Sequence, residues 1–165
     1  MPPKYFLRSQ GYEPVQLLRY ALDHKNAALL LFATSFDYHD SAAYLAHLSV
    51  ELCLKALLLD RADRFPDSHD LVSLSTDVCA AGLDLQWSRS EDQALRVIGA
   101  DWDVRYPHPN APKPVGHSHR DALLLLWGRL ADTIPTELRE LVRTMPHNKK
   151  GGRILMTKRI TPEAK

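Results

Sequence analysis

The stretch from Ser41 to Ala62 constrains the fold of this chain more than any other part of the sequence. If it forms a helix, leucines occupy one face and other apolar residues cover much of the remaining circumference, so other helices must cover it on nearly every side. The exceptions are Tyr44, His47, Glu51 and Lys55, whose spacings of three and four residues place them on one narrow stripe. We interpret this polar stripe as a candidate site. The alternative is an ordinary surface ion pair between Glu51 and Lys55, which are four residues apart.

Helical periodicity and helix-end residues predict further helices on both sides of this central one. We expect helices over residues 14–34 (Pro14 in the first turn), 41–62 (capped by Asp40 or Ser41), 68–82 (capped by Asp67 or Ser68), 90–99 (opened by a capping box from Ser90 to Gln93), 118–133 (capped by Ser118) and 135–144 (Pro135 in the first turn). A short connection follows the first long helix, so it should pack antiparallel to the central helix.

The rest of the chain shows little sign of strands. Before Pro146 no segment alternates convincingly, the lead-in before residue 13 looks loose, and short strand character is limited to residues 153–160. Four prolines and a glycine between Tyr106 and His119 exclude a helix or a central strand there, so we expect a functional or disordered loop. The prediction is an all-α fold.

Length and composition indicate one soluble domain. A chain of 165 residues with 45% hydrophobic residues can bury a core of its own. No apolar run approaches the roughly 18 residues that cross a bilayer, and the first residues lack the apolar segment of a secretory signal. We therefore expect a cytoplasmic protein with no membrane contact. Cys53 and Cys79 lie in apolar helical patterns, and we interpret both as buried thiols.

Charge separates the chain into two parts. Residues 147–165 carry six basic side chains and one acidic side chain, whereas the residues before them carry 15 basic and 19 acidic. We expect a single helical domain over residues 1–146 and a basic C-terminal tail over residues 147–165. The tail could meet a phosphate backbone or could be a solvated end.

Other chemistry-bearing residues give weaker signals. His108, His117 and His119 lie on the proline-rich segment, but without carboxylates or thiols at ligand spacing they do not predict a metal site. We expect no cofactor either, because no glycine-rich phosphate loop is present. Trp102 could stack on a base, but an aromatic residue at a helix end more often covers the core. Trp127 lies within an apolar helix and should be buried.

Three motifs in order give a family resemblance. The central helix contains Val-Glu-Leu-Cys-Leu-Lys-Ala from Val50, His69-Asp70-Leu71 opens the next helix, and Arg105-Tyr106-Pro107 follows the fourth helix. With these motifs, residues of about 15–141 resemble a HEPN domain (higher eukaryotes and prokaryotes nucleotide-binding).

The resemblance implies an up-and-down bundle of four to five helices that commonly forms a homodimer. It also implies that Glu51, Lys55, Arg105 and Tyr106 converge on one groove that binds a nucleotide or RNA, with His47 and His69 close by. Arg105 would pair with Glu51 or hold a phosphate bidentately. A buried network that fixes helix packing without any ligand is the alternative.

Many HEPN domains resemble metal-independent endoribonucleases, in which an arginine and a histidine lie four to six residues apart. This chain departs from that pattern, because only two residues separate Arg105 from His108. Arg64 and His69 have the right separation, but they lie between the second and third helices, and we interpret that match as coincidence.

Three hypotheses follow from these residues. The first is a nucleotide- or RNA-binding module, in a toxin-antitoxin or defence system, with an antitoxin or a nucleotidyltransferase as a possible partner. The second is a metal-independent endoribonuclease in which Arg105 acts with His108 or His69. The third is a non-catalytic structural or interaction module.

Overall fold

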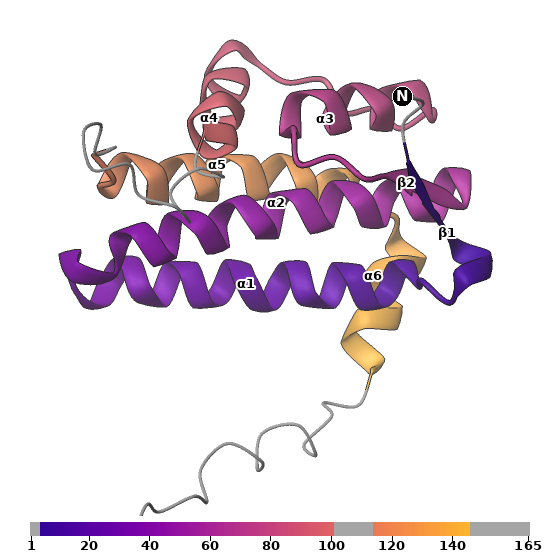
Figure 1. The fold of residues 1–165 in the computed structure, drawn as a ribbon, viewed down its shortest axis with the longest axis horizontal. Coiled ribbons are helices and arrows are strands. Elements are labelled where there is room, and N and C mark those ends of the chain that lie inside the picture. The colour runs from indigo at the N-terminus through magenta and orange to yellow at the C-terminus, as the bar shows by residue number, and fades with distance from the viewer. Residues whose placement is uncertain (1–3, 101–113, 146–165) are drawn as a thin grey trace, which may run out of the picture.

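A computed structural model describes residues 4–100 and 114–145 of the chain, and it is built almost wholly of helices (Figure 1). The elements are β1 (Tyr5–Leu7), the short 3-10 helix η1 (Arg8–Gln10), α1 (Pro14–Thr34), the 3-10 helix η2 (Phe36–Tyr38), α2 (His39–Ala62), β2 (Arg64–Pro66), α3 (Leu71–Ala80), α4 (Arg89–Gly99), α5 (His117–Thr133) and α6 (Thr136–Thr144). The all-α prediction is confirmed. The long helices α1 and α2 run antiparallel, as their short connection predicts (Figure 1).

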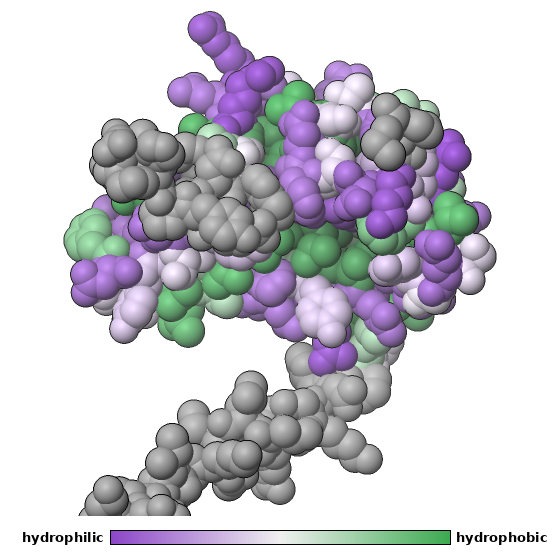
Figure 2. Space-filling view, in the orientation of Figure 1, coloured by the Kyte–Doolittle hydropathy of each residue, from purple (hydrophilic) through white to green (hydrophobic). Residues whose placement is uncertain are grey.

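Helix α2 is the centre of the molecule. Fifteen of its 24 residues are buried, and α1, α3, α4 and α5 all contact it. With η2 it forms the one stretch, among the described residues, that is long and apolar enough to cross a membrane by length and composition alone. However, 78% of that apolar window is buried inside the protein, as expected of a core helix. In Figure 2, hydrophilic residues cover the side that carries α3, and hydrophobic residues show along the α1–α2 pair.

The helices begin close to the predicted positions, but different residues cap them. Ser35 caps η2 by accepting a hydrogen bond from the Asp37 amide, and η2 leads directly into α2, which has no side-chain cap. The prediction of Asp40 or Ser41 as the cap was therefore wrong. Helix α3 is capped by Asp70 rather than by Asp67 or Ser68, because the chain is still extended at β2 and turns only afterwards.

Two later helix starts also differ from the sequence prediction. The capping box of α4 is formed by Ser88 and Glu91, not by the predicted Ser90 to Gln93, so Ser90 lies inside the first turn. Gly116 occupies the cap position of α5, and the predicted cap Ser118 lies within the helix. At both helix starts, two residues that can occupy the cap position lie close together in the sequence. The cap is the residue at which the chain changes from an extended to a helical conformation.

The N-terminal lead-in is ordered, contrary to the sequence prediction of a loose segment without strands. β1 pairs antiparallel with β2, with Phe6 opposite Phe65. Their rings stack with centroids 5.3 Å apart, and the ring of Tyr12 meets Phe65 edge-on. Strands of three residues are too short to show an alternating pattern, so their pairing depends on the aromatic contacts that the fold supplies. The predicted strand character of residues 153–160 lies outside the described residues.

The two cysteines differ in environment. Cys53 is fully buried in α2, and burial raises the pKa of its thiol to about 12. Cys79 is exposed on α3, which corrects the prediction that both thiols are buried. Trp127 is buried as predicted, and its indole N–H donates to the Ser49 hydroxyl over 3.1 Å.

Candidate functional site

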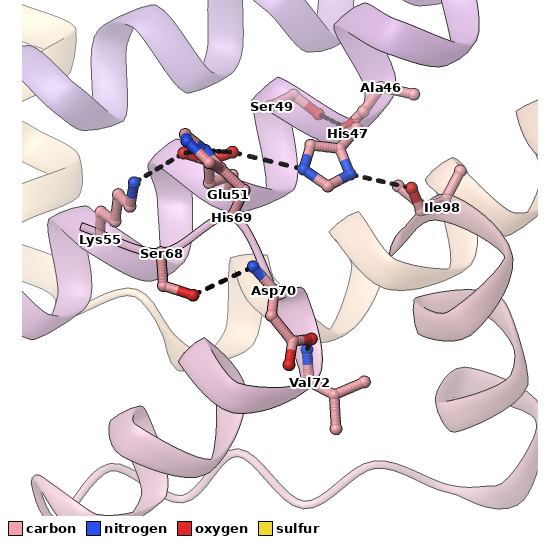
Figure 3. A network of polar contacts seen from close by, with 10 residues as sticks. All are labelled: Ala46, His47, Ser49, Glu51, Lys55, Ser68, His69, Asp70, Val72 and Ile98. Carbon is pink, nitrogen blue, oxygen red and sulfur yellow. Dashed lines mark hydrogen bonds and ion pairs between the residues drawn. The ribbon is translucent and has the colours of Figure 1, made fainter. Parts of the chain in front are cut away.

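Four side chains of the predicted stripe and its neighbourhood meet around the carboxylate of Glu51 (Figure 3). We call Glu51, His47, Lys55 and His69 the Glu51 cluster. The Lys55 ammonium donates to Glu51 Oε1 over 2.7 Å, His47 Nε2 lies 3.3 Å from Oε2, and His69 Nδ1 lies 3.1 Å from both oxygens. Both oxygens of one carboxylate are thus occupied by potential donors.

Burial is uneven within the cluster. Glu51 and Lys55 are 3% and 5% exposed and His47 is completely buried, so the stripe faces the interior of the bundle. The side chain of His69 is 44% exposed. The interpretation of Glu51 and Lys55 as an ordinary surface pair was therefore wrong, since α3 and the segment before it cover this part of α2. His69 is the member of the cluster that solvent reaches.

His47 connects the cluster to the end of α4. Its Nδ1 donates to the carbonyl oxygen of Ile98 over 3.1 Å, while Nε2 faces Glu51. A carbonyl oxygen acts only as an acceptor, so Nδ1 is the donor in that hydrogen bond, and Nε2 lies at ion-pair distance from the carboxylate. The fold thereby ties the last turn of α4 to the carboxylate on α2.

The turn before α3 places His69 over the cluster. The Asp70 side chain accepts from the Val72 amide over 3.1 Å, and the Ser68 hydroxyl accepts from the Asp70 amide over 3.2 Å (Figure 3). These bonds stabilise the start of α3 and the turn that leads into it. Because His69 lies between Ser68 and Asp70, its ring is directed by a hydrogen-bonded backbone on both sides.

The electrostatics favour an ionised Glu51. Burial on its own would raise the pKa of this carboxyl, but the contacts from His47, Lys55 and His69, together with the positive charge of Lys55, outweigh burial and lower the pKa to about 2. The Lys55 ammonium also lies 5.6 Å from the centre of the Phe65 ring. The cluster therefore holds a buried negative charge beneath a histidine at the surface.

This arrangement can orient and polarise His69. A neutral imidazole whose Nδ1–H donates to a carboxylate carries its lone pair on Nε2, so the contact with Glu51 fixes the tautomer and the orientation of the ring. Such a histidine can contact a phosphate in its charged form or exchange a proton with a hydroxyl in its neutral form.

The structure describes only some of the other residues that the sequence indicated. Arg105, Tyr106 and His108 lie outside the described residues. Arg64 stacks its guanidinium 4.8 Å from the centre of the Tyr5 ring, and the contacts recorded for His69 join it to Glu51 instead. Tyr44 is half-buried on α2.

Sequence reasoning missed the residues that support the cluster. The Ile98 carbonyl could not be found from the sequence, because a backbone atom on another helix leaves no local signal. Asp70 could have been found, since an aspartate directly before an apolar helical pattern is a typical N-cap.

Among the described residues, no group of three or more histidine, cysteine or carboxylate side chains could hold a metal ion. The ring of His117 lies 5.8 Å from that of His39, and His119 Nδ1 accepts from the Gly116 amide at the start of α5.

Comparisons with known proteins identify a family and a solved structure with a similar fold. The family model of the HEPN domain matches residues 15–126, which is more than half of the chain. The crystal structure of TT1696 from Thermus thermophilus has a similar fold, with a TM-score of 0.52 and 23% sequence identity over 82% of this chain and 99% of that chain. No curated protein matches the chain. On the extent of the family match, the chain belongs to the HEPN domain family.

Proposed function

We propose that this protein is a nucleotide- or RNA-binding HEPN module whose contact surface lies at the Glu51 cluster, with Arg105 and Tyr106 completing it. HEPN domains are in general nucleotide-binding or ribonuclease-like modules, which supports the class of ligand. In this proposal His69 and Arg105 contact phosphate, Tyr106 stacks or hydrogen-bonds, and Glu51 with Lys55 orients the groups above them.

One observation supports the proposal most strongly, namely the pairing of a buried carboxylate with a half-exposed histidine. Glu51 would not need an ionised state for helix packing alone, because apolar side chains of similar volume pack at least as well in a bundle core. An anionic group held beneath His69 keeps that ring in one orientation.

The proposal is tested with a mixed RNA pool in EDTA, recording both retention on a filter and cleavage. We compare wild type with Arg105→Ala and His69→Ala. His24→Ala is the matched control, because His24 lies on α1 and is not one of the side chains that pair with Glu51. Retention that both site variants lose, and that the control keeps, supports the proposal. Equal retention by all four proteins would contradict it.

A metal-independent endoribonuclease is the second candidate function, and the Glu51–His69 contact favours it specifically. Here His69, or His108, accepts the proton of the 2′-hydroxyl as that oxygen attacks the adjacent phosphate, while Arg105 stabilises the developing charge. The bond from phosphorus to the 5′-oxygen breaks, water donates the proton that the leaving 5′-oxygen takes up, and the products are a 2′,3′-cyclic phosphate and a 5′-hydroxyl. Cleavage in EDTA would then disappear with Arg105→Ala and with one of the two histidine changes. Retention without cleavage in the same experiment would support the binding module instead.

A third candidate is an interaction module whose polar stripe is satisfied internally. The contacts to both Glu51 oxygens favour it, since they could fix the packing of α2, α3 and α4 without a ligand. This function predicts no RNA retention by wild type and normal assembly of the Arg105→Ala variant.

The assembly proposed is a cytoplasmic homodimer, with an antitoxin or nucleotidyltransferase as a further partner in a defence system. Exposed apolar side chains near the turn between α1 and α2 support an interface there: Leu30, Phe36 and Tyr38 are 67%, 71% and 48% exposed. Light scattering after size exclusion should report a dimer for wild type and a monomer for Leu30→Ser with Phe36→Ser.

A further inference from the structure

A groove lies where α1, α5 and α6 meet, on a different part of the molecule from the Glu51 cluster. It has a volume of about 330 Å³, within the range of small-molecule sites. Apolar side chains line much of it: Leu18 and Leu22 from α1, Trp127 from α5, Ile134 from the connection to α6, and Val142 from α6.

The polar residues lining this groove are all basic. Lys25 projects from α1, and Arg139 and Arg143 project from α6. Glu140 pairs with Arg143 over 2.8 Å, whereas no ion pair is recorded for Lys25 or Arg139 in the described part of the chain. The Lys25 ammonium lies 5.2 Å from the centre of the Trp127 ring, so it stands directly beside the apolar surface. The apolar surface of the groove therefore lies next to two cationic side chains, Lys25 and Arg139, that come from different helices.

We propose that this α1–α5–α6 groove binds a small molecule that has an apolar body and one anionic group, such as an aromatic or acyl carboxylate, sulfonate or phosphate. The apolar body packs against Leu22, Ala131 and Val142, which keep part of their surface in water, and binding removes that surface and the ligand's own from solvent. The anionic group pairs with Lys25 and Arg139, and the apolar walls strengthen that attraction by excluding part of the solvent.

Charge argues against the chain's own C-terminal tail as the occupant. Residues 147–165 follow α6 in the sequence, and they carry six basic side chains against one acidic. A basic segment would bring like charges beside Lys25 and Arg139, which is unfavourable. The volume also suits a small molecule better than a helix of a partner protein.

The experiment titrates the full chain with anilinonaphthalene sulfonate, an aromatic anion whose fluorescence rises in apolar sites. Phenylnaphthylamine, which has the same aromatic body without the sulfonate, is the matched probe. Lys25→Gln with Arg139→Gln removes the two cations, and Ala131→Phe fills the groove from its exposed lining residue. Ala33→Phe is the control, because Ala33 is an exposed alanine near the end of α1.

We expect one saturable site for the anionic dye, with binding about tenfold weaker in the double glutamine variant and weaker at high salt. Ala131→Phe should abolish this site and Ala33→Phe should leave it unchanged. Thermal unfolding of each variant checks that the fold persists. If Ala131→Phe is unfolded, the affinity of the double glutamine variant for the anionic dye tests the proposal. Three results would each overturn the proposal. The anionic dye could show no saturable site, it could bind equally well to the double glutamine variant and to wild type, or the uncharged probe could bind with the same affinity as the anionic dye.

Discussion

Replacing Glu51 with glutamine should destabilise the protein strongly at neutral pH and weakly in acid. The pKa of Glu51 in the folded protein is about 2, against an ordinary value of 4.5. Because the folded value is the lower one, the stabilisation is complete above pH 4.5 and is lost as the pH falls towards 2. At about 1.4 kcal/mol for each pKa unit, the ionised carboxylate contributes about 3 kcal/mol at pH 7.

Loss of the buried ion pair between Glu51 and Lys55 predicts a decrease of similar size in the free energy of unfolding. In Glu51→Gln the Lys55 ammonium stays 5% exposed but loses its carboxylate partner at 2.7 Å. Removing one partner of a buried ion pair typically costs about 3–5 kcal/mol. We therefore expect the free energy of unfolding to fall by about 3 kcal/mol at pH 7. By linkage, only about 1 kcal/mol of the contribution remains near pH 3.

The assay is urea denaturation of wild type and Glu51→Gln at pH 7 and pH 3, followed by tryptophan emission, to which the buried Trp127 contributes. Glu140→Gln serves as the control, because Glu140 pairs with Arg143 at the surface and such pairs contribute at most about 1 kcal/mol. If Glu51→Gln fails to fold alone, adding Lys55→Met should restore folding, since the uncompensated ammonium is then gone. A cost below about 0.5 kcal/mol at pH 7, or equal costs at both pH values, would refute this account of the cluster.

Three further substitutions test the local contacts. Asp70→Ala removes the N-cap of α3 and should lower the free energy of unfolding by about 1 kcal/mol in urea denaturation, with His69 becoming more mobile in NMR spectra. Ser88→Ala should cost about 1 kcal/mol by thermal or urea unfolding, whereas Ser90→Ala should cost almost nothing, and the reverse order would show that the capping box is misplaced. Ser49→Ala leaves the buried indole N–H of Trp127 without its acceptor, so we expect a loss of about 1–3 kcal/mol and a changed emission maximum; unchanged values would contradict this hydrogen bond.

The candidate site was only partly predictable. His47, Glu51 and Lys55 could be grouped from the sequence because three- and four-residue spacings on one helix bring side chains to one face whatever the rest of the fold does. His69 entered only through a family resemblance, since its contact with Glu51 bridges 18 residues and depends on the turn before α3. Periodicity also gave no means of deciding whether the stripe faces solvent or the interior.

The sequence by itself determined the order of the helices, the central position of α2 and the all-α class, because helical periodicity and apolar content are local properties that survive in any packing. Tertiary structure decided that Asp70 caps α3 and Ser88 caps α4, whereas α2 has no side-chain cap. It also decided that Phe6 and Phe65 stack across two short strands and that Cys79 is exposed. It also decided that the Glu51 carboxylate is buried and ionised beneath His69. Those features depend on where the chain turns and on which surfaces then meet, and neither is encoded in the spacing of residues along one helix.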